Sequence, residues 1–315
     1  MVTLAQTLFG HTIAAVDIGS NALRAVIARP RGTKIEVLKE IREPLRLGED
    51  VFYKGAISPE KCAQMEDTFI RLLHLFAAYG VSDVRAVATS AMRDAPNSVE
   101  LATNIARYTG IEIETIRGRE EALVIYQAVR AELNLKKKTT VLMDIGGGST
   151  EISLVVQGEL VATHSFNIGT VRLLAHTDPE EMEIRIHIAT QKMLQFVLAH
   201  LGKRKVEVFI GTGGNLRRIG KIRRKVMKKS GQECTFPEIT RMTEILQTMS
   251  LVERIRELEL DGNRADVILP ATLIVRSFMR GLGAKKILLP YVGLKEGIIL
   301  SMLDQGPRKF IRPKA

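Results

Sequence analysis

The sequence is short of the residues that would stabilise or anchor a protein by special means. Its 315 residues include only two cysteines, Cys62 and Cys234, and no tryptophan. Two cysteines form neither a disulfide framework nor a zinc cage, so a reducing cytoplasm is the expected location. The longest apolar runs, such as residues 267–275, are shorter than the ~18 residues of a membrane span, and the N-terminus does not read as a signal peptide. We therefore expect a cytoplasmic protein with an ordinary hydrophobic core and no membrane partner.

Several common nucleotide-binding and catalytic motifs are also missing. The chain has no G-x-x-x-x-G-K-[ST] loop and no G-x-G-x-x-G segment that opens a helix, which excludes the P-loop and Rossmann classes. It has no G-x-S-x-G elbow of a serine hydrolase. Its six histidines are not spaced as metal ligands. Any catalytic chemistry must therefore use other side chains.

Positive charge, in contrast, is abundant and unevenly distributed. The formal net charge is +11, and the window from 203 to 229 holds eleven lysines and arginines against one acidic residue, Glu207. A basic surface of this density is typical of a solvated helix face, a nucleic-acid footprint or the wall of a site for another polyanion. No aromatic residue that could stack on a base lies among the cations from 217 to 229, which argues against nucleic acid.

Two similar segments organise the chain. Residues 12–28 and 139–156 each read as a strand, a tight polar turn and a second strand. Each first strand ends in Asp-Ile-Gly, and aligning these triplets places Arg24 opposite Glu151. A repeat at half-chain scale predicts two related domains that face each other.

Helices are expected between the strands. Ser58 and Pro59 have the sequence of a helix start, and further helical patterns cover residues 98–108, 119–133, 179–201 and 215–229. Strands that alternate with helices predict an α/β fold with parallel strand pairs. The run Lys136-Lys137-Lys138 marks a crossover, and a hinge, between the two domains.

Three glycine-rich turns are the most informative feature of the sequence. Two follow Asp17 and Asp144, and the third is Gly211-Thr212-Gly213-Gly214. Glycine lets backbone N–H groups approach an anion closely, and an aspartate at a strand end can hold Mg²⁺ beside bound phosphates. A single such turn could equally just close a β-hairpin. Three of them, two with aspartate in matching places, favour a phosphate site.

Two further positions have both a structural and a catalytic interpretation. Gly118-Arg119-Glu120-Glu121-Ala122 lies where a strand leads into a helix, and acidic residues in a first helical turn commonly just stabilise the helix dipole. Arg93 follows a strand end, where an arginine is usually exposed. Spacing alone does not choose between these interpretations.

Taken together, the motifs resemble those of the exopolyphosphatase/guanosine pentaphosphate phosphohydrolase (Ppx/GppA) family, within the actin/hexokinase/heat-shock ATPase superfamily. The resemblance covers residues 13–303 and rests on four segments in order: Asp17-Ile18-Gly19-Ser20-Asn21 with Arg24, the stretch from Ala88 to Asn97, Gly118-Arg119-Glu120-Glu121-Ala122, and the stretch from Asp144 to Glu151. It implies two ribonuclease-H-like α/β domains that flank a cleft, here residues 1–135 with 300–315 and residues 136–299. The chain is similar to the short, two-domain form of the family.

The same resemblance implies Mg²⁺-dependent hydrolysis of a terminal phosphoanhydride, with a monovalent cation as a further cofactor in view. Glu121 falls on the general-base position, and Asp144, Glu151 and Asp17 fall on metal and water-positioning carboxylates. Phosphate contacts are implied for Ser20, Asn21, Arg24, Arg93, Gly146, Gly147, Gly148, Ser149, Gly211, Thr212, Gly213 and Gly214. From the basic window, Arg217, Arg218, Lys221 and Arg224 are the candidates for binding the rest of a polyanion.

Inorganic polyphosphate is the expected substrate. The alternatives are hydrolysis of pppGpp by the same residues, and a protein that binds polyphosphate or ppGpp without turnover. The sequence leaves the oligomeric state open, a homodimer included. Residues 293–297 fit the family, but Lys295 stands where the family usually has arginine, and Leu288-Leu289-Pro290 is an unfamiliar approach to it. The sequence therefore leaves the role of Lys295 and of residues 288–297 open.

Overall fold

The computed structural model describes residues 11–31, 34–175 and 178–305. The chain divides into two compact units, Met1–Ala128 with Leu294–Ala315, and Val129–Gly293. The sequence placed these boundaries at 135/136 and 299/300; its crossover at Lys136 lies in the second unit. The ends of the expected first domain, residues 1–10 and 306–315, lie outside the described residues.

The boundary between Gly293 and Leu294 precedes the last helix, because the whole of this helix belongs to the first unit. This helix, α13, spans Leu294–Gln305. Its Gly297 lies directly against helix α5 (Gly118–Glu132), where a Cβ atom would come within 2.1 Å of the carbonyl oxygen of Val124. A boundary at residue 300 would cut through this packed helix.

The first unit is built on a five-stranded mixed sheet in the order β3-β2-β1-β4-β5. Strands β1, β2 and β3 form an antiparallel meander, and β4 and β5 continue parallel to β1. The strands span Thr12–Ile18 (β1), Leu23–Arg31 (β2), Lys34–Glu43 (β3), Val81–Ala88 (β4) and Ile113–Thr115 (β5).

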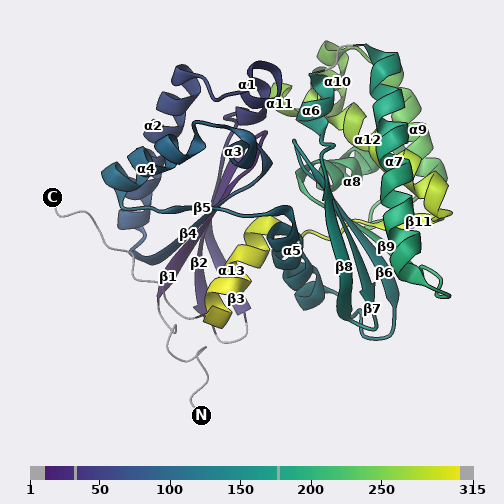
Figure 1. The fold of residues 1–315 in the computed structure, drawn as a ribbon, viewed down its shortest axis with the longest axis horizontal. Helices are drawn as coiled ribbons and strands as arrows, with labels where there is room; N and C mark the ends of the chain where they lie inside the picture. Colours follow the sequence, from purple (N-terminus) through teal and green to yellow (C-terminus); the bar gives the residue numbers. More distant parts are fainter. Residues whose placement is uncertain (1–10, 32–33, 176–177, 306–315) are drawn as a thin grey trace. The chain divides into compact units, whose positions relative to one another are not determined.

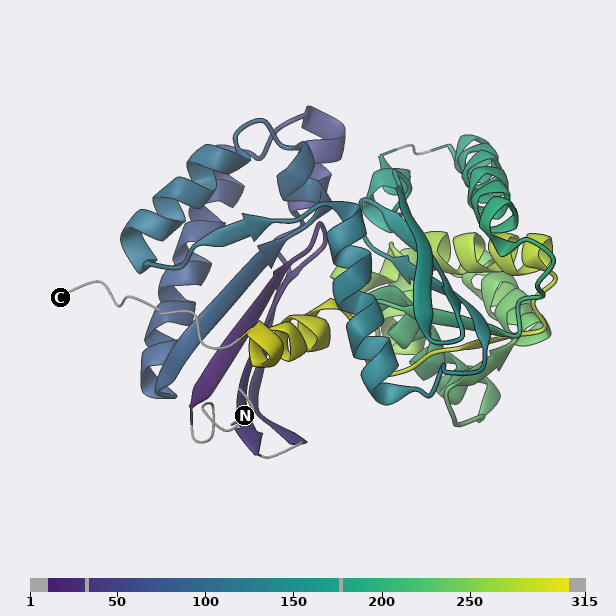
Figure 2. The ribbon, with the colours of Figure 1, turned by 60° about the horizontal axis from the view of Figure 1, so that its bottom comes forward.

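Helices cover both faces of this first sheet. Helices α2 and α4 lie on one face and α13 on the other, as Figures 1 and 2 show. The helices of this unit before α5 are α1 (Leu47–Lys54), α2 (Pro59–Ala78), α3 (Ser90–Asp94) and α4 (Ser98–Thr109). Val16 and Ile18 of β1 join the core with Phe69 and Phe76 of α2. Because strand side chains alternate between faces, Asp17 points to the opposite, α13 side.

The start of α2 confirms one sequence prediction in detail. Ser58 has extended backbone, and its side chain accepts a hydrogen bond from the backbone N–H of Lys61, with Pro59 in the first turn. This is the arrangement that a serine cap followed by proline predicts.

The second unit contains a six-stranded sheet in the order β10-β11-β9-β6-β7-β8. Strands β6, β7 and β8 form an antiparallel meander, β9 and β11 run parallel to β6, and β10 adds an antiparallel edge. The strands span Thr139–Ile145 (β6), Thr150–Val156 (β7), Glu159–Phe166 (β8), Val208–Thr212 (β9), Glu233–Thr235 (β10) and Lys286–Leu288 (β11).

The second core lies between this sheet and a group of helices that includes α7 and α12 (Figure 1). Phe278 of α12 packs against Phe209 of β9, with their ring centroids 5.4 Å apart. The helices of the unit are α6 (Thr170–Leu174), α7 (Pro179–Leu201), α8 (Gly214–Met227), α9 (Phe236–Thr248), α10 (Leu251–Leu258), α11 (Gly262–Ala265) and α12 (Ile268–Leu282).

The two sheets confirm the α/β fold class and the internal repeat. Counting each meander as strands 1, 2 and 3, both units have the strand order 3-2-1-4-5, and the second adds only β10. The Asp-Ile-Gly triplets occupy the same place in both, at the end of the central strand, β1 or β6. Among the described helices, none is long and apolar enough to cross a membrane.

Candidate active site

In the first unit, the end of the central strand presents an ion pair. Asp17 on β1 lies opposite Arg24 on β2, and the Arg24 Nη1 donates to Asp17 Oδ2 at 3.1 Å. Burial raises the pKa of the Asp17 carboxyl, and the charge of Arg24 opposes this shift only in part. The paired arginine therefore compensates incompletely for burying this carboxylate.

Lys295 and Glu296 of α13 extend this charged group. Glu296 raises and Lys295 lowers the pKa of Asp17, both less strongly than burial does. The Lys295 ammonium forms ion pairs with Glu40 on β3 and with Glu296. Lys295, which stands where arginine is usual, thus links α13 to the sheet.

The turn between β1 and β2 is fixed through its carbonyl groups. The carbonyl oxygens of Ser20 and Asn21 accept hydrogen bonds from the backbone N–H groups of Gly48, at 2.8 Å, and Arg46, at 3.2 Å. In a trans peptide the C=O and N–H groups point in opposite directions. The N–H groups of Asn21 and Ala22 therefore point away from α1, as an anion-binding turn requires.

Two further contacts fix the neighbourhood of this turn. The hydroxyl groups of Ser20 and Ser90 are hydrogen-bonded at 2.9 Å in a buried environment. The backbone N–H of Thr89, just before α3, donates to the carbonyl of Ile18 at 3.1 Å. The start of α3 is thus tied to the end of β1.

The structure separates the two adjacent glutamates of the third motif. Glu120 is exposed, and its Oε2 accepts the backbone N–H of Arg117 at 2.8 Å, which is the structural role expected at a helix start. Glu121 is only 5% exposed. Its Oε2 lies 3.9 Å from the Nη1 of Arg93, which itself donates to the carbonyl of Ile116 at 2.9 Å. Glu120 therefore supports the helix, and Glu121 is a buried carboxylate beside a cation.

In the second unit, four polar side chains form a row across the end of the sheet. Antiparallel pairing places Asp144 opposite Glu151 and Glu151 opposite Ser165, and parallel pairing places Asp144 beside Thr212. The Thr212 hydroxyl donates to Asp144 Oδ1 at 2.6 Å, and the Ser165 hydroxyl donates to Glu151 Oε1 at 2.7 Å. Directly paired residues share one face of a sheet. Two carboxylates thus lie side by side, each oriented by a hydroxyl.

These carboxylates fit a hard divalent cation. Asp144 and Glu151 could hold a metal ion. Glu121 of the first unit is a third carboxylate that could serve as a metal ligand. Mg²⁺ prefers carboxylate oxygens and usually keeps several water ligands. No histidine or cysteine takes part in this row, which disfavours the softer metals.

The glycine turn of the second unit resembles the first in its construction. The carbonyl of Gly146 accepts from Thr170 N–H at 3.1 Å, and that of Gly147 accepts from the N–H groups of Val171 and Arg172 at 2.8 and 3.0 Å. The Arg172 side chain bonds the Gly148 carbonyl at 2.8 Å. The opposite ends of these peptides, the N–H groups of Gly147, Gly148 and Ser149, point away from α6.

The third glycine segment divides into two roles. Gly211 lies in β9, where a Cβ would come within 2.7 Å of Ile287 and Leu216, so its small size serves core packing. Gly213 has φ +95°, and a Cβ there would be 3.0 Å from Asp144 Oδ1. It both turns the chain from β9 into α8 and makes room for the carboxylate. Gly214 is the first residue of α8.

Several cations of the basic window are already paired within the second unit. Arg223 is buried and forms a bidentate ion pair with Glu238, at 3.0 and 3.2 Å, which Lys229 also contacts. Despite burial, hydrogen bonds from Lys229, Thr235 and Arg223 lower the pKa of Glu238 to about 2. Lys225 pairs with Glu259.

The remaining cations of α8 include a stripe at helical spacing. Arg217, Lys221 and Arg224 recur at intervals of four and three residues, so they share one face over about 10 Å. Lys221 and Arg224 are exposed. Arg217 and Arg224 both bond Tyr291, through its carbonyl and its hydroxyl. Arg218 lies about 100° around the helix from this stripe.

Ser165 and Ser90 are site residues that sequence reasoning missed. Each lies beside a predicted residue only through a long-range contact, β8 with β7 for Ser165 and α3 with the first turn for Ser90. Once the meander register is known, Ser165 follows from alternation along β8. Ser90 lies within the motif from Ala88 to Asn97, but that motif does not indicate the contact between Ser90 and Ser20.

Comparisons with known proteins bear on the family of the chain. The model of the Ppx/GppA phosphatase family matches residues 26–306. The chain is 25% identical to Exopolyphosphatase 1 of Mycobacterium tuberculosis over 305 residues, covering 93% of this chain and 88% of that protein. It is 22% identical over 319 residues to guanosine-5'-triphosphate,3'-diphosphate pyrophosphatase of Vibrio cholerae, covering 99% of this chain and 63% of that protein.

A solved structure has the same fold. The crystal structure of an exopolyphosphatase from Cytophaga hutchinsonii superimposes with a TM-score of 0.85 at 23% identity, covering 94% of this chain and 99% of that one. The architecture of both units is therefore that of this group of phosphatases.

Proposed function

Because the chain belongs to the Ppx/GppA phosphatase family, whose members hydrolyse phosphoanhydride bonds, we propose that it is an exopolyphosphatase that releases orthophosphate from the ends of inorganic polyphosphate. The cation stripe on α8 is the observation that favours a long linear polyanion over a nucleotide. It begins one turn after Gly213, next to the carboxylate row. We also propose a cytoplasmic location, as the two cysteines suggest.

Hydrolysis needs a base for the attacking water, and Glu121 suits this role. It is buried, and burial in a partly dry site favours the proton-accepting function of a carboxylate. The water oxygen bonds to the terminal phosphorus while Glu121 accepts its proton. The bond from that phosphorus to the bridging oxygen breaks, which releases orthophosphate and a chain shorter by one phosphate.

The other predicted residues would bind and neutralise the phosphates. Arg93, held beside Glu121, would balance charge on the non-bridging oxygens. The turns after Asp17 and Asp144 would offer backbone N–H groups to the phosphates, with Ser20, Asn21 and Ser149 adding side chains.

Mg²⁺, the metal that the family resemblance implies, fits the carboxylates of Asp144 and Glu151, with Asp17 on the first unit as a further candidate. When bound, the ion would supply Lewis-acid stabilisation of charge on the phosphoryl oxygens. The hydroxyl groups of Thr212 and Ser165 orient these carboxylates before any ion binds.

The test of the proposal is a comparison of substrates. We expect Mg²⁺-dependent phosphate release from long polyphosphate with a kcat/KM at least about tenfold above that for pppGpp, a difference of ~1.4 kcal/mol. The opposite preference would identify the chain as a pentaphosphate phosphohydrolase, like its Vibrio cholerae relative by name. Tight binding of polyphosphate or ppGpp without turnover would identify a binding protein.

The role of the α8 stripe gives a second prediction. Reversing the charges of Lys221 and Arg224 to glutamate should raise KM for long polyphosphate about fivefold to tenfold and change KM for tripolyphosphate less than about twofold. Only a long chain reaches from the carboxylate row along the helix, so only its binding should weaken.

A matched control is available in the same window. Lys203 and Lys205 are equally exposed but precede β9 at the end opposite Thr212, and reversing both gives the same change in net charge. Steady-state kinetics over a series of chain lengths decides the matter. Equal effects of the two double variants, or equal effects at all lengths, would make α8 an ordinary solvated face.

A further inference from the structure

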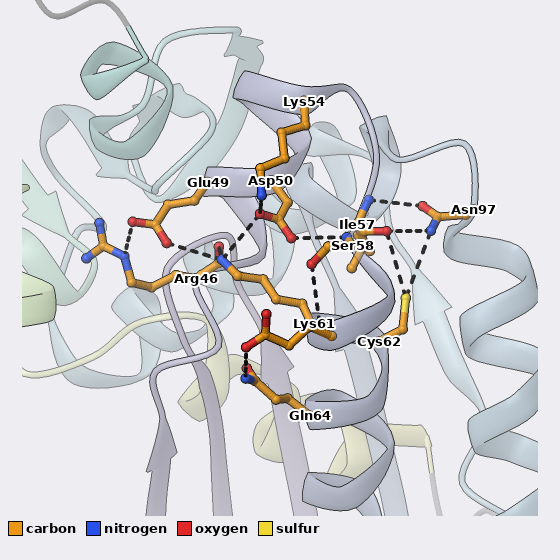
Figure 3. Close-up of polar contacts among 11 residues, drawn as sticks. Arg46, Glu49, Asp50, Lys54, Ile57, Ser58, Lys61, Cys62, Gln64 and Asn97 are labelled. Atoms are coloured by element: carbon orange, nitrogen blue, oxygen red, sulfur yellow. Dashed lines mark hydrogen bonds and ion pairs between the residues drawn. The ribbon is translucent and has the colours of Figure 1, made fainter.

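A network of charged residues around the buried Asp50 lies behind the phosphate turn of the first unit. It joins α1 to the start of α2 and contains Arg46, Glu49, Asp50, Lys54 and Lys61 (Figure 3). None of these residues belongs to the proposed catalytic or phosphate-binding groups. Asp50 is 3% exposed, and burying such charges is costly unless they are well paired.

Asp50 is the centre of this network. Its carboxylate accepts the backbone N–H of Ser58 at 3.0 Å and the ammonium of Lys54 at 3.0 Å, and the Lys61 ammonium lies 3.9 Å away. Burial acts to raise the pKa of Asp50, but the hydrogen bonds from Ser58 and Lys54 and the charge of Lys61 outweigh it, so the pKa is lowered. The carboxylate is therefore held in its charged form at neutral pH.

Lys61 extends the network from α2 to the first residues of α1. Its ammonium donates to the carbonyl of Arg46 at 2.6 Å and to Glu49 Oε2 at 3.1 Å, as Figure 3 shows. Arg46, the residue before α1, has left-handed backbone with φ +51°. This conformation costs a non-glycine residue about 1–2 kcal/mol, so surrounding contacts must hold it in place.

Arg46, the residue with left-handed backbone, contacts the phosphate turn directly. Arg46 and Gly48 donate their backbone N–H groups to the carbonyls of Asn21 and Ser20. The contact is close, since a Cβ on Gly48 would come within 2.9 Å of the Ser20 Cβ. The conformation of Arg46 thus sets where α1 begins and which way the turn's peptides face.

The second unit achieves the same result by different means. There, α6 bonds the carbonyls of Gly146 and Gly147 with three backbone N–H groups and that of Gly148 with the Arg172 side chain. In the first unit, Arg46 and Gly48 at the start of α1 donate backbone N–H groups to the equivalent turn. The position of this turn therefore depends on the contacts that hold Arg46.

We propose that Lys61, fixed by Asp50, is a positioning residue for the phosphate-binding turn Gly19–Ala22: it holds the strained Arg46 so that α1 aims the turn's N–H groups at the substrate. The effect on catalysis rests on the proposed function, whereas the effect on the turn itself does not. Lys61 never touches substrate in this proposal.

The experiment compares two lysines that share the same aspartate. Lys61→Met keeps the aliphatic stem and removes the bonds to Arg46 and Glu49. Lys54→Met removes a bond to the same Asp50 from a side chain that is 68% exposed. Lys61→Arg restores a donor. The measurements are amide hydrogen exchange of Gly48 and Arg46 by NMR, and kcat and KM for tripolyphosphate.

We expect Lys61→Met to speed exchange of the Gly48 amide about tenfold and to raise KM about tenfold, with kcat changed less than about twofold. Lys54→Met should leave the Gly48 exchange rate and KM within about twofold of the wild-type values. Lys61→Arg should bring KM most of the way back to the wild-type value. A mutation that only lowered overall stability would speed exchange in the core of the unit as well.

The outcomes separate this proposal from the proposed function. Unchanged Gly48 exchange in Lys61→Met, or the same acceleration in Lys54→Met, would overturn the positioning role. If the wild-type protein releases no phosphate from polyphosphate, the proposed function fails, and the exchange of Gly48 and Arg46 still decides whether Lys61 positions the turn.

Discussion

Replacing Glu121 with glutamine should lower kcat for phosphate release from polyphosphate by about 10³-fold, within the 10²–10⁴-fold range typical of a general base. Glutamine has nearly the same shape and keeps an oxygen beside Arg93, but it does not accept a proton from water. KM should change less than about threefold, because the phosphate-binding turns are left intact. Steady-state kinetics with long polyphosphate measures both constants.

The neighbouring Glu120 provides the control. Glu120→Gln makes the same chemical change one residue earlier, at an exposed side chain that bonds only the N–H of Arg117 among its described contacts. It should retain activity within about twofold, with a small loss of stability from the weakened helix start. Full activity of Glu121→Gln, or equal losses in the two variants, would remove Glu121 as the base.

Replacing Asp144 with asparagine should lower activity by about 100-fold or more and weaken metal binding by a similar factor. Asparagine keeps an oxygen that accepts from Thr212, so the row across the sheet should remain, but one negative charge beside Glu151 is lost. Mn²⁺ binding followed by electron paramagnetic resonance reports on the site without relying on turnover. Higher metal concentrations should recover part of the activity.

Ser165→Ala serves as the graded comparison. It leaves both carboxylates and removes only the hydroxyl that orients Glu151. We therefore expect activity and metal affinity to fall by about tenfold. Undiminished Mn²⁺ affinity in Asp144→Asn would contradict the assignment of this row as the metal site. A loss in Ser165→Ala as large as in Asp144→Asn would indicate that the row serves folding rather than metal binding.

The two hairpins, and the equivalence of their Asp-Ile-Gly triplets, were predicted from the sequence. In the structure Asp17 pairs with Arg24 and Asp144 with Glu151, because a short turn fixes the register of the two strands it joins. Equivalent positions in two such hairpins could therefore be aligned without any structure.

Burial was beyond the reach of the sequence. Glu120 and Glu121 are adjacent and of the same type, and their different environments depend on which side of α5 the rest of the protein covers. The sequence also did not show which cations of the basic window are paired. Glu238 pairs with Arg223 and Lys229, and Glu259 pairs with Lys225, although both glutamates lie outside the window in sequence. The charge on the surface is therefore smaller than the charge counted along the chain.

The sequence by itself thus determined the fold class, the repeated hairpins and the carboxylates at their ends, because these depend on local alternation and short turns. The tertiary structure alone decided that Glu121 and not Glu120 is buried, that Thr212 and Ser165 bond the carboxylates, and that Arg46 and Gly48 bond the first turn. These features arise from contacts between residues far apart in the chain, and no local pattern encodes which distant side chain will fill a given place.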